Sequence, residues 1–242
     1  VTIPLYSGYT AKIGDQIITS TNNKREMTMT TGAGSDMEVV YTADTQKAQV
    51  QIFDDDAKDS TLPIWQTELS GTTAEAVDFT VGNDQLKYFL SHGYQLAANG
   101  NNDLDGKRFK TAYYDNVDGV DQTFVAHLVH GKRTFNFGDP QPTGKMYSDD
   151  ENSPAWPTMT LSEDATQTIK YTGAGTNTPG NKMQTAKDAF KRTATVDLVT
   201  GKVEYSTFSG NNVTFNPETT DVVPGYHVAE SNKTAGGLTA TH

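Results

Sequence analysis

The stretch Asn101–Gly106 (NNDLDG) combines residue types and a spacing that bind calcium. Oxygen-bearing side chains occupy alternate positions, and the final glycine permits a sharp bend. Ca²⁺ takes about six to eight oxygen ligands, so further acidic residues would have to complete the shell. The candidate ligands are Asn101, Asp103, Asp105, Asp115 and Asp118, with Asp121 as a further donor. The loop lacks a glutamate at its twelfth position and also fits an ordinary solvated turn, so both interpretations stay open.

A second acidic stretch, Asp54–Asp59 (DDDAKD), is interpreted as a solvated turn, because adjacent carboxylates repel unless water or a cation screens them. The histidines do not have the spacing of a metal site. His127 and His130 lie an odd number of positions apart in a predicted strand, so they are expected on opposite faces. Neither His-Glu-x-x-His nor Gly-x-Ser-x-Gly occurs. We therefore predict that the protein is not an enzyme, with no catalytic residues and no required cofactor.

Two tryptophans are the candidates for stacking against a sugar. The apolar C–H face of a sugar packs on an exposed aromatic ring, while its hydroxyls bond to polar neighbours. Trp156 lies between Pro154 and Pro157, and this stiff loop is expected to hold the ring toward solvent. Trp65 follows Leu62-Pro63-Ile64 and fits a core position or an edge strand better. The competing interpretation for both is burial, which is the usual fate of tryptophan.

Composition narrows the class of partner. The 242 residues include 19 basic and 30 acidic side chains, which give a formal net charge of −11. A nucleic-acid partner is not expected, since phosphate binding needs a basic surface. Cysteine is absent, which removes disulfides and, for an extracellular protein, favours the Gram-positive surface. No stretch approaches the length of a membrane span. Val1 is not a natural start, so we expect a fragment that contains neither signal peptide nor anchor.

Most of the chain is predicted to form strands rich in Thr, Val, Ile and aromatic residues. They lie at 37–41, 48–53, 123–129, 166–171 and 193–198. Gly201 predicts a tight hairpin from the last of these to 203–205, since it tolerates a positive φ. One helix is predicted at Asn83–His92, capped by Asn83 or Asp84 and ended by Gly93. A weaker helix is predicted at Lys182–Phe190.

A Gly-Tyr pair followed by a strand-like stretch occurs three times, at 8–9, 93–94 and 225–226. At 93 the glycine ends the predicted helix, whereas at 8 and 225 it is expected to end a turn. Such repetition favours related units. Strands around one helix indicate a small mixed sheet, and the proline-rich stretch 137–157 is typical of a joint or long loop. The predicted domains are 1–45, 46–134 and 135–242.

Longer motifs carry a family resemblance. YTADTQKAQVQIFDDDAKDSTL and ELSGTTAEAVDF, within 41–79, resemble the opening of the first half of a mucus-binding (Mub) repeat of lactobacilli. FVAHLVHGKRT at 124–134 resembles the strand that closes that half. TQTIKYTGAG and FKRTATVDLVTGKVEYSTFS, within 166–209, together with VVPGYHV at 222–228, resemble the second half. The similarity extends over roughly residues 40–230.

The resemblance implies an α+β, β-rich fold in which tandem β-grasp (ubiquitin-like) subunits form an elongated rod. Residues 46–134 and 135–242 would be the two subunits, and 1–45 the tail of a preceding repeat or an N-terminal leader. It also implies an extracellular adhesin anchored to the cell wall of a Gram-positive bacterium, with mucin glycoproteins as partners and tandem repeats as neighbours. Immunoglobulin binding has been attributed to some such repeats.

Three functions stay open at this stage. The repeat would bind mucin glycans, or it would bind a protein such as immunoglobulin through an exposed sheet edge like Ala48–Phe53, or it would be a structural spacer. A Lys–Asn isopeptide cross-link is a further hypothesis, for which a buried strand lysine such as Lys170 is the candidate.

Overall fold

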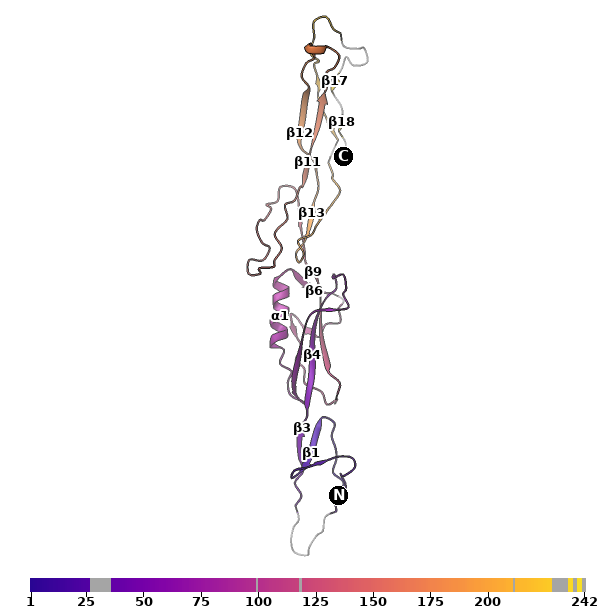
Figure 1. Cartoon of the computed structure of the whole chain (residues 1–242), viewed down its shortest axis with the longest axis vertical. Helices are drawn as coiled ribbons and strands as arrows, with labels where there is room; N and C mark the ends of the chain where they lie inside the picture. Colours follow the sequence, from indigo (N-terminus) through magenta and orange to yellow (C-terminus); the bar gives the residue numbers. More distant parts are fainter. Residues whose placement is uncertain are drawn as a thin grey trace. The chain divides into compact units, whose positions relative to one another are not determined.

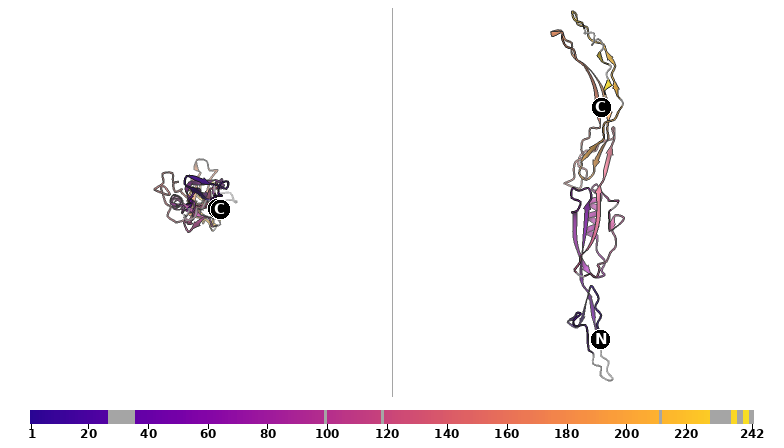
Figure 2. Two further views of the ribbon diagram at one scale, coloured as in Figure 1. Left: turned by 90° about the horizontal axis from the view of Figure 1, so that it is seen from below. Right: turned by 90° about the vertical axis from the view of Figure 1, so that its right-hand side faces the viewer.

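The computed structural model describes residues 1–26, 36–98, 100–117, 119–210, 212–227, 235–236 and 239–240. The chain divides into two compact units, Val1–Gly131 (unit 1) and Lys132–His242 (unit 2). Within the described residues the structure consists mostly of strands, as the sequence predicts, and contains one α-helix, where the sequence predicts two (Figures 1 and 2). In that same part of the chain, no helix is long and apolar enough to cross a membrane.

Unit 1 begins with a small antiparallel sheet of order β2-β1-β3. Its strands are β1 (Tyr9–Ile13), β2 (Gln16–Ile18) and β3 (Val40–Ala43). Gly8 precedes β1 in a turn at φ 77°, which confirms the turn expected at the first Gly-Tyr pair. Ile3, Ala11 and Ile18 form the small core beneath this sheet.

The main sheet of unit 1 has the order β5-β4-β9-β6. Its strands are β4 (Thr45–Asp54), β5 (Pro63–Thr72), β6 (Tyr94–Leu96) and β9 (Gln122–His130). β4 is antiparallel to β5 and parallel to β9, so the first and last long strands lie side by side. The predicted edge at Ala48–Phe53 is therefore wrong, because β4 is flanked on both sides. The outer strand next to it is β5.

Helix α1 (Thr80–Ser91) packs against this sheet through Leu86, which is fully buried with Val50, Ile52 and Leu128. The helix begins three residues before its predicted start. Asp78 accepts hydrogen bonds from the N–H and hydroxyl of Thr80, and these bonds fix the first turn. Asn83 is not the cap: its side-chain oxygen accepts the backbone N–H of Phe109, 2.9 Å away. Gly93, at φ 91°, follows the helix end as predicted.

Unit 2 contains a three-stranded antiparallel sheet of order β10-β13-β14, formed by β10 (Lys132–Phe135), β13 (Ala194–Asp197) and β14 (Val203–Tyr205). The predicted hairpin between the last two is confirmed, with Gly201 at φ 73°. A two-stranded ribbon pairs β11 (Ser162–Ile169) with β12 (Lys182–Lys191). The first core contains Phe135 and Val196, and the second contains Phe190 and Phe215.

The prediction of a helix at Lys182–Phe190 is wrong, because this segment is strand β12. A helix would have placed Met183 on the same face as Phe190, seven positions later. In the strand Phe190 is buried, whereas Met183 is 69% exposed. Pairing with β11 across Ala165 and Ala186 outweighs the weak helical pattern.

The remaining elements are short. They are β7 (Leu104–Asp105), β8 (Arg108–Phe109), β15 (Val213–Thr214), β16 (Pro217–Glu218), β17 (Ala235–Gly236), β18 (Thr239–Ala240) and the 3₁₀ turn Gly175–Asn177.

Candidate functional site

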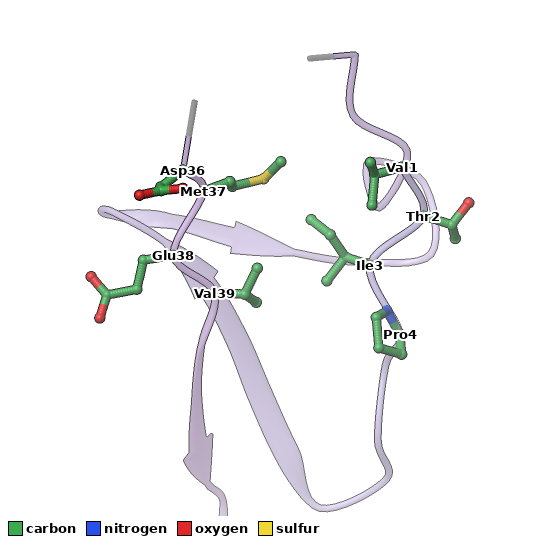
Figure 3. A pocket seen from close by; sticks show the side chains of 8 residues that line it. All are labelled: Val1, Thr2, Ile3, Pro4, Asp36, Met37, Glu38 and Val39. Carbon is green, nitrogen blue, oxygen red and sulfur yellow. The ribbon is translucent and has the colours of Figure 1, made fainter. Parts of the chain in front are cut away.

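The N-terminal sheet of unit 1 borders an open hollow of about 510 Å³. It is lined by Val1–Pro4 and Asp36–Val39. Met37 and Val39 point toward Ile3, while the carboxylates of Asp36 and Glu38 point away (Figure 3). This arrangement offers apolar contact and no pair of groups positioned for chemistry.

Trp156 lies over strand β10 of unit 2. Its ring meets Phe135 edge to face, with ring centroids 5.9 Å apart, and is half-buried in the core of that sheet. The backbone N–H of Trp156 donates to the carbonyl of Gly144 at 2.8 Å, which fixes the proline-rich loop. The expectation that this loop holds the ring out in solvent is wrong, since one side of the indole packs on the sheet. The other side leaves the ring partly accessible.

An arginine accompanies this ring. The guanidinium of Arg133 lies 4.6 Å from the centroid of Phe135 and 5.7 Å from that of Trp156. A cation over an aromatic face is attracted by the negative charge of the ring face. Arg133 and Phe135 therefore make the β10 edge of the sheet both cationic and aromatic.

A second arginine–aromatic cluster lies beside the β14 edge. The guanidinium of Arg192 is 3.8 Å from the ring centroid of Tyr205 and 4.4 Å from that of Phe208. Its Nε donates to the carbonyl of Thr160 at 2.8 Å. Tyr205 is 40% exposed. Sequence reasoning missed this cluster, although Arg192 directly precedes the predicted hairpin, Tyr205 is its last residue and Phe208 follows it.

Strand register places Phe135 of the first cluster and Tyr205 of the second on one face of the sheet. Phe135 pairs with Ala194, and Ala194 pairs with Tyr205. Directly opposed residues of antiparallel strands share a face, and neighbouring strands are about 4.8 Å apart. We call Trp156, Phe135, Tyr205, Phe208, Arg133 and Arg192 the arginine–aromatic row. Phe135 is buried at its centre, and the rings at both ends are accessible.

Trp65 lies in β5, the outer strand of the unit 1 sheet, where it pairs with Ile52. It is partly buried against the main core of that unit. This position agrees with the core or edge-strand interpretation, and the ring, like that of Trp156, is partly buried.

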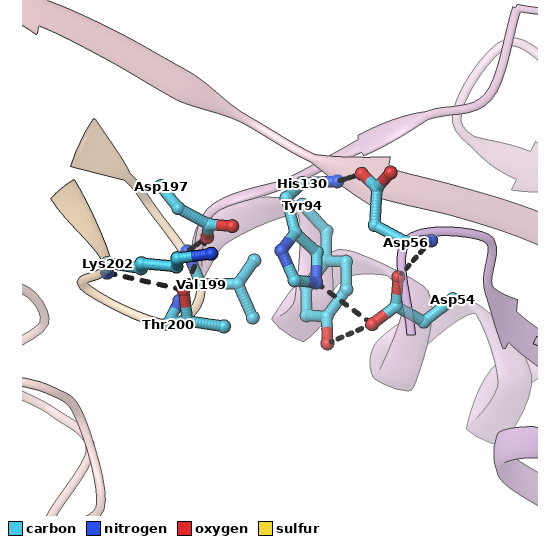
Figure 4. A network of polar contacts seen from close by, with 8 residues as sticks. All are labelled: Asp54, Asp56, Tyr94, His130, Asp197, Val199, Thr200 and Lys202. Carbon is cyan, nitrogen blue, oxygen red and sulfur yellow. Dashed lines mark hydrogen bonds and ion pairs between the residues drawn. The ribbon is translucent and has the colours of Figure 1, made fainter. Parts of the chain in front are cut away.

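In the acidic stretch Asp54–Asp59, residues 55–59 form a mostly exposed turn, as interpreted, but the first residue, Asp54, ends strand β4 and is buried. Asp54 is 5% exposed and lies 2.9 Å from Nε2 of His130, and it accepts a 3.3 Å hydrogen bond from the Tyr94 hydroxyl (Figure 4). Asp56 accepts the backbone N–H of His130 at 2.7 Å. We call Asp54, Asp56, Tyr94 and His130 the Asp–His network. It ties together the ends of β4, β6 and β9.

A second pair, Asp55 with Nδ1 of His127 at 2.8 Å, is more exposed. The sequence signal for both pairs lay in the parallel register of β4 and β9, which places Asp54 opposite Leu128, two positions before His130. Figure 4 also draws the hairpin turn of unit 2, where Asp197 accepts the N–H groups of Val199 and Thr200.

The candidate calcium ligands serve local backbone bonds. Asp103 accepts the N–H of Val125 at 2.8 Å, and Asp115 accepts that of Val117 at 3.0 Å. Asn101 and Asp105 are exposed, and Asp118 lies outside the described residues. Among the residues that the structure describes, no group of three or more His, Asp or Glu side chains is placed to hold a metal. The calcium site stays a prediction.

Comparison with known protein families gives one matching family in each half of the chain. The profile of the mucin binding domain matches residues 46–130, and that of the Muc B2-like domain matches residues 157–242. The chain belongs to the mucus-binding (Mub) repeats. No curated protein sequence matches it.

Two solved structures are similar to this Mub repeat, and the first supports its fold. The type 2 repeat of the mucus binding protein MUB from Lactobacillus reuteri is similar at 20% identity, with a TM-score of 0.51, over 78% of this chain and 88% of that one. The crystal structure of Mub-RV is 23% identical, with a TM-score of 0.46, over 81% of this chain and 91% of that one.

The matched ranges divide the candidate residues of the Mub repeat. Trp65 and the Asp–His network fall within the mucin binding domain. Arg192, Tyr205 and Phe208 fall within the Muc B2-like domain, and Trp156 stands immediately before it.

Lys170, the lysine considered for an isopeptide bond, is exposed and lies just beyond β11, so the predicted burial is wrong.

Proposed function

We propose that this Mub repeat binds the glycans of mucins and makes or breaks no bond. The observation that carries the proposal is the arginine–aromatic row of unit 2, where Tyr205 and Trp156 present accessible rings at the two edges of one sheet. Aromatic rings pack on the apolar faces of sugars, and the guanidinium groups beside them supply hydrogen-bond donors.

Several finer statements belong to the same proposal. The strand order of unit 1, with the parallel pair β4–β9 at its centre and one helix on the sheet, supports a β-grasp (ubiquitin-like) subunit. The family of the two matched domains supports an extracellular surface adhesin, and we extend this to a protein anchored to the cell wall. Tandem copies in a rod would make weak sites effective through high local concentration.

Recognition of a protein is the second candidate function. β5 is a ten-residue outer strand whose side chains alternate between half-buried and exposed, and Ile64 is among the exposed ones. Such an edge can add a strand from a partner such as an immunoglobulin, without any sugar-binding residue. A structural spacer remains the alternative if the folded repeat binds nothing.

One binding experiment separates these functions. The fragment 1–242 is applied to immobilised mucin, either intact or oxidised with periodate, with calcium and then with a chelator. We expect binding to intact mucin that is lost after oxidation and kept with chelator. Binding that survives oxidation would favour recognition of protein through β5, and loss with chelator would establish a calcium site. A folded fragment that does not bind intact mucin would contradict the proposal.

A further inference from the structure

Arg192 makes four contacts within unit 2. Its guanidinium lies 3.8 Å from the ring centroid of Tyr205 and 4.4 Å from that of Phe208. Its Nε donates to the carbonyl of Thr160, and its backbone N–H donates to that of Leu161. An arginine side chain normally loses rotational freedom when it binds a ligand, and here that freedom is already restricted.

The charge of this side chain is not matched by an acid. Within the described residues Arg192 forms no ion pair, whereas Lys182 pairs with Asp221 and Lys187 with Asp164. The acidic neighbour of Tyr205 in β14 is Glu204, which pairs with Thr195 and so points to the opposite face.

The remaining donors have a defined chemistry. Nε is used, and the two terminal nitrogens of Arg192 have no hydrogen-bond partner among the described residues. These paired N–H groups form a planar fork that matches the two oxygens of a carboxylate or sulfate. The rings beside it exclude water from its faces, which strengthens a charge-assisted bond at its edge.

We propose that Arg192, Tyr205 and Phe208 form a subsite for an anionic sugar, one that bears a carboxylate or a sulfate ester. This rests on the proposed function, because it names the class of glycan that the β14 end of the arginine–aromatic row selects. Tyr205 stacks on the sugar ring, and the Arg192 fork receives the anionic group. The net charge of −11 repels anions elsewhere, so selection depends on this local cation.

The first test uses small probes and the whole fragment 1–242. Ligand-observed NMR compares sialyllactose with lactose and galactose 6-sulfate with galactose, at low and at high salt. We expect at least one anionic probe to bind about tenfold more tightly than its neutral partner, and this preference to fall with added salt. Equal binding of both pairs would overturn the proposal.

The second test is mutational. Arg192→Gln removes the charge and Arg192→Lys keeps it without the fork, so binding of the anionic probe should fall about tenfold in the first and partly in the second. Binding of the neutral sugar should not change. Arg108→Gln is the control, since it removes an exposed arginine of unit 1 that lies outside the arginine–aromatic row. Equal losses for anionic and neutral sugars would mean that Arg192 only braces Tyr205 and Phe208, and would overturn the proposal.

Mucin treated with sialidase or chemically desulfated distinguishes the two sources of the anion. Loss of wild-type binding after one treatment identifies the carboxylate or the sulfate. Wild-type binding to mucin that survives both treatments, with no effect of Arg192→Gln, would contradict the anionic subsite and leave glycan binding intact. Absence of binding to untreated mucin would instead refute the proposed function, and the small probes would still decide on Arg192.

Discussion

The two units use their polar and aromatic residues in opposite ways. In unit 1 the chemically active groups point into the fold: Asp54 and His130 form a buried pair, and Trp65 packs on the core. In unit 2 Arg192 and Tyr205 form an accessible cluster that leaves donors free within the described structure. Polar and aromatic residues whose groups pair with other residues of the chain stabilise the fold. Residues that are ordered but accessible are available to a ligand. On this comparison we propose that the ligand binds to unit 2.

The hydrophobic cores of the two units also differ in size. Within the described residues, unit 1 has a core of ten buried residues in its main sheet and a second core of three in its N-terminal sheet. Unit 2 has two buried clusters, of five and three residues. Each unit contains one tryptophan packed on its core, so fluorescence of variants that retain only Trp65 or only Trp156 reports on each unit separately.

The largest expected effect is loss of the buried pair in unit 1. Asp54→Ala removes a buried hydrogen-bond acceptor from both His130 and Tyr94, and losing such a partner costs about 1–3 kcal/mol for each buried group. Denaturant unfolding followed by Trp65 should show this loss. Asp55→Ala is the matched control, because its pair with His127 is more exposed and contributes about 0–1 kcal/mol. Equal effects of the two changes would contradict a buried network.

A cavity in the unit 1 core is the next largest perturbation. Leu86→Ala should reduce the free energy of unfolding of that unit by about 2–5 kcal/mol, since Leu86 is fully buried. The Trp65 transition should shift while the Trp156 transition stays in place. Val81→Ala, on an exposed position of the same helix, should change the free energy of unfolding by less than about 0.5 kcal/mol. A shift of both transitions would mean that the units do not unfold independently.

The smallest expected effect is a change in the stability of unit 1 at low pH. Hydrogen bonds from the hydroxyl and N–H of Thr80 hold the pKa of Asp78 below its ordinary value of 3.8. A carboxylate with a depressed pKa in the folded state stabilises that state above the ordinary pKa, and the contribution disappears as pH falls through the lowered one. Asp78→Asn should therefore slightly reduce unit 1 stability at pH 7, with the difference from wild type vanishing below pH 3.8. A difference that persists in strong acid would contradict this origin.

In unit 2 the corresponding carboxylate is Asp164, whose pKa is lowered chiefly by its hydrogen bond from Lys187. The same pair raises the pKa of Lys187. The Lys187 contribution is present below the ordinary lysine pKa of 10.5 and is lost as pH rises through the raised value. Asp164→Asn should change the Trp156 transition only slightly at neutral pH, because both groups are exposed. A large shift there would contradict the view that this pair is peripheral.

Local sequence patterns predicted much of the fold. The strands of unit 1, the hairpin at Gly201 and the turns at Gly8 and Gly93 depend on alternation and on glycine φ, which neighbouring residues determine. The β12 segment was mispredicted because its pairing with β11 depends on residues about twenty positions away. Local propensity carries no information about such a partner.

The candidate site was less predictable for the same reason. The Asp–His network requires the parallel register of β4 and β9, which brings together residues 76 positions apart. Arg192 lay in a recognised motif, but its position beside Tyr205 and Phe208 follows from the return of β14 beside β13. Trp156 was identified from its residue type, and the packing of its ring on Phe135 was not.

Binding of mucin by matched tyrosine variants of the whole fragment tests the comparison most directly. Tyr205→Ala removes an accessible ring from unit 2, and Tyr113→Ala removes an equally large exposed side chain from unit 1. With both variants shown to be folded by their unfolding transitions, we expect Tyr205→Ala to weaken binding to immobilised mucin about tenfold and Tyr113→Ala to leave it unchanged. Loss of binding in Tyr113→Ala with full binding in Tyr205→Ala would contradict the assignment of the ligand to unit 2.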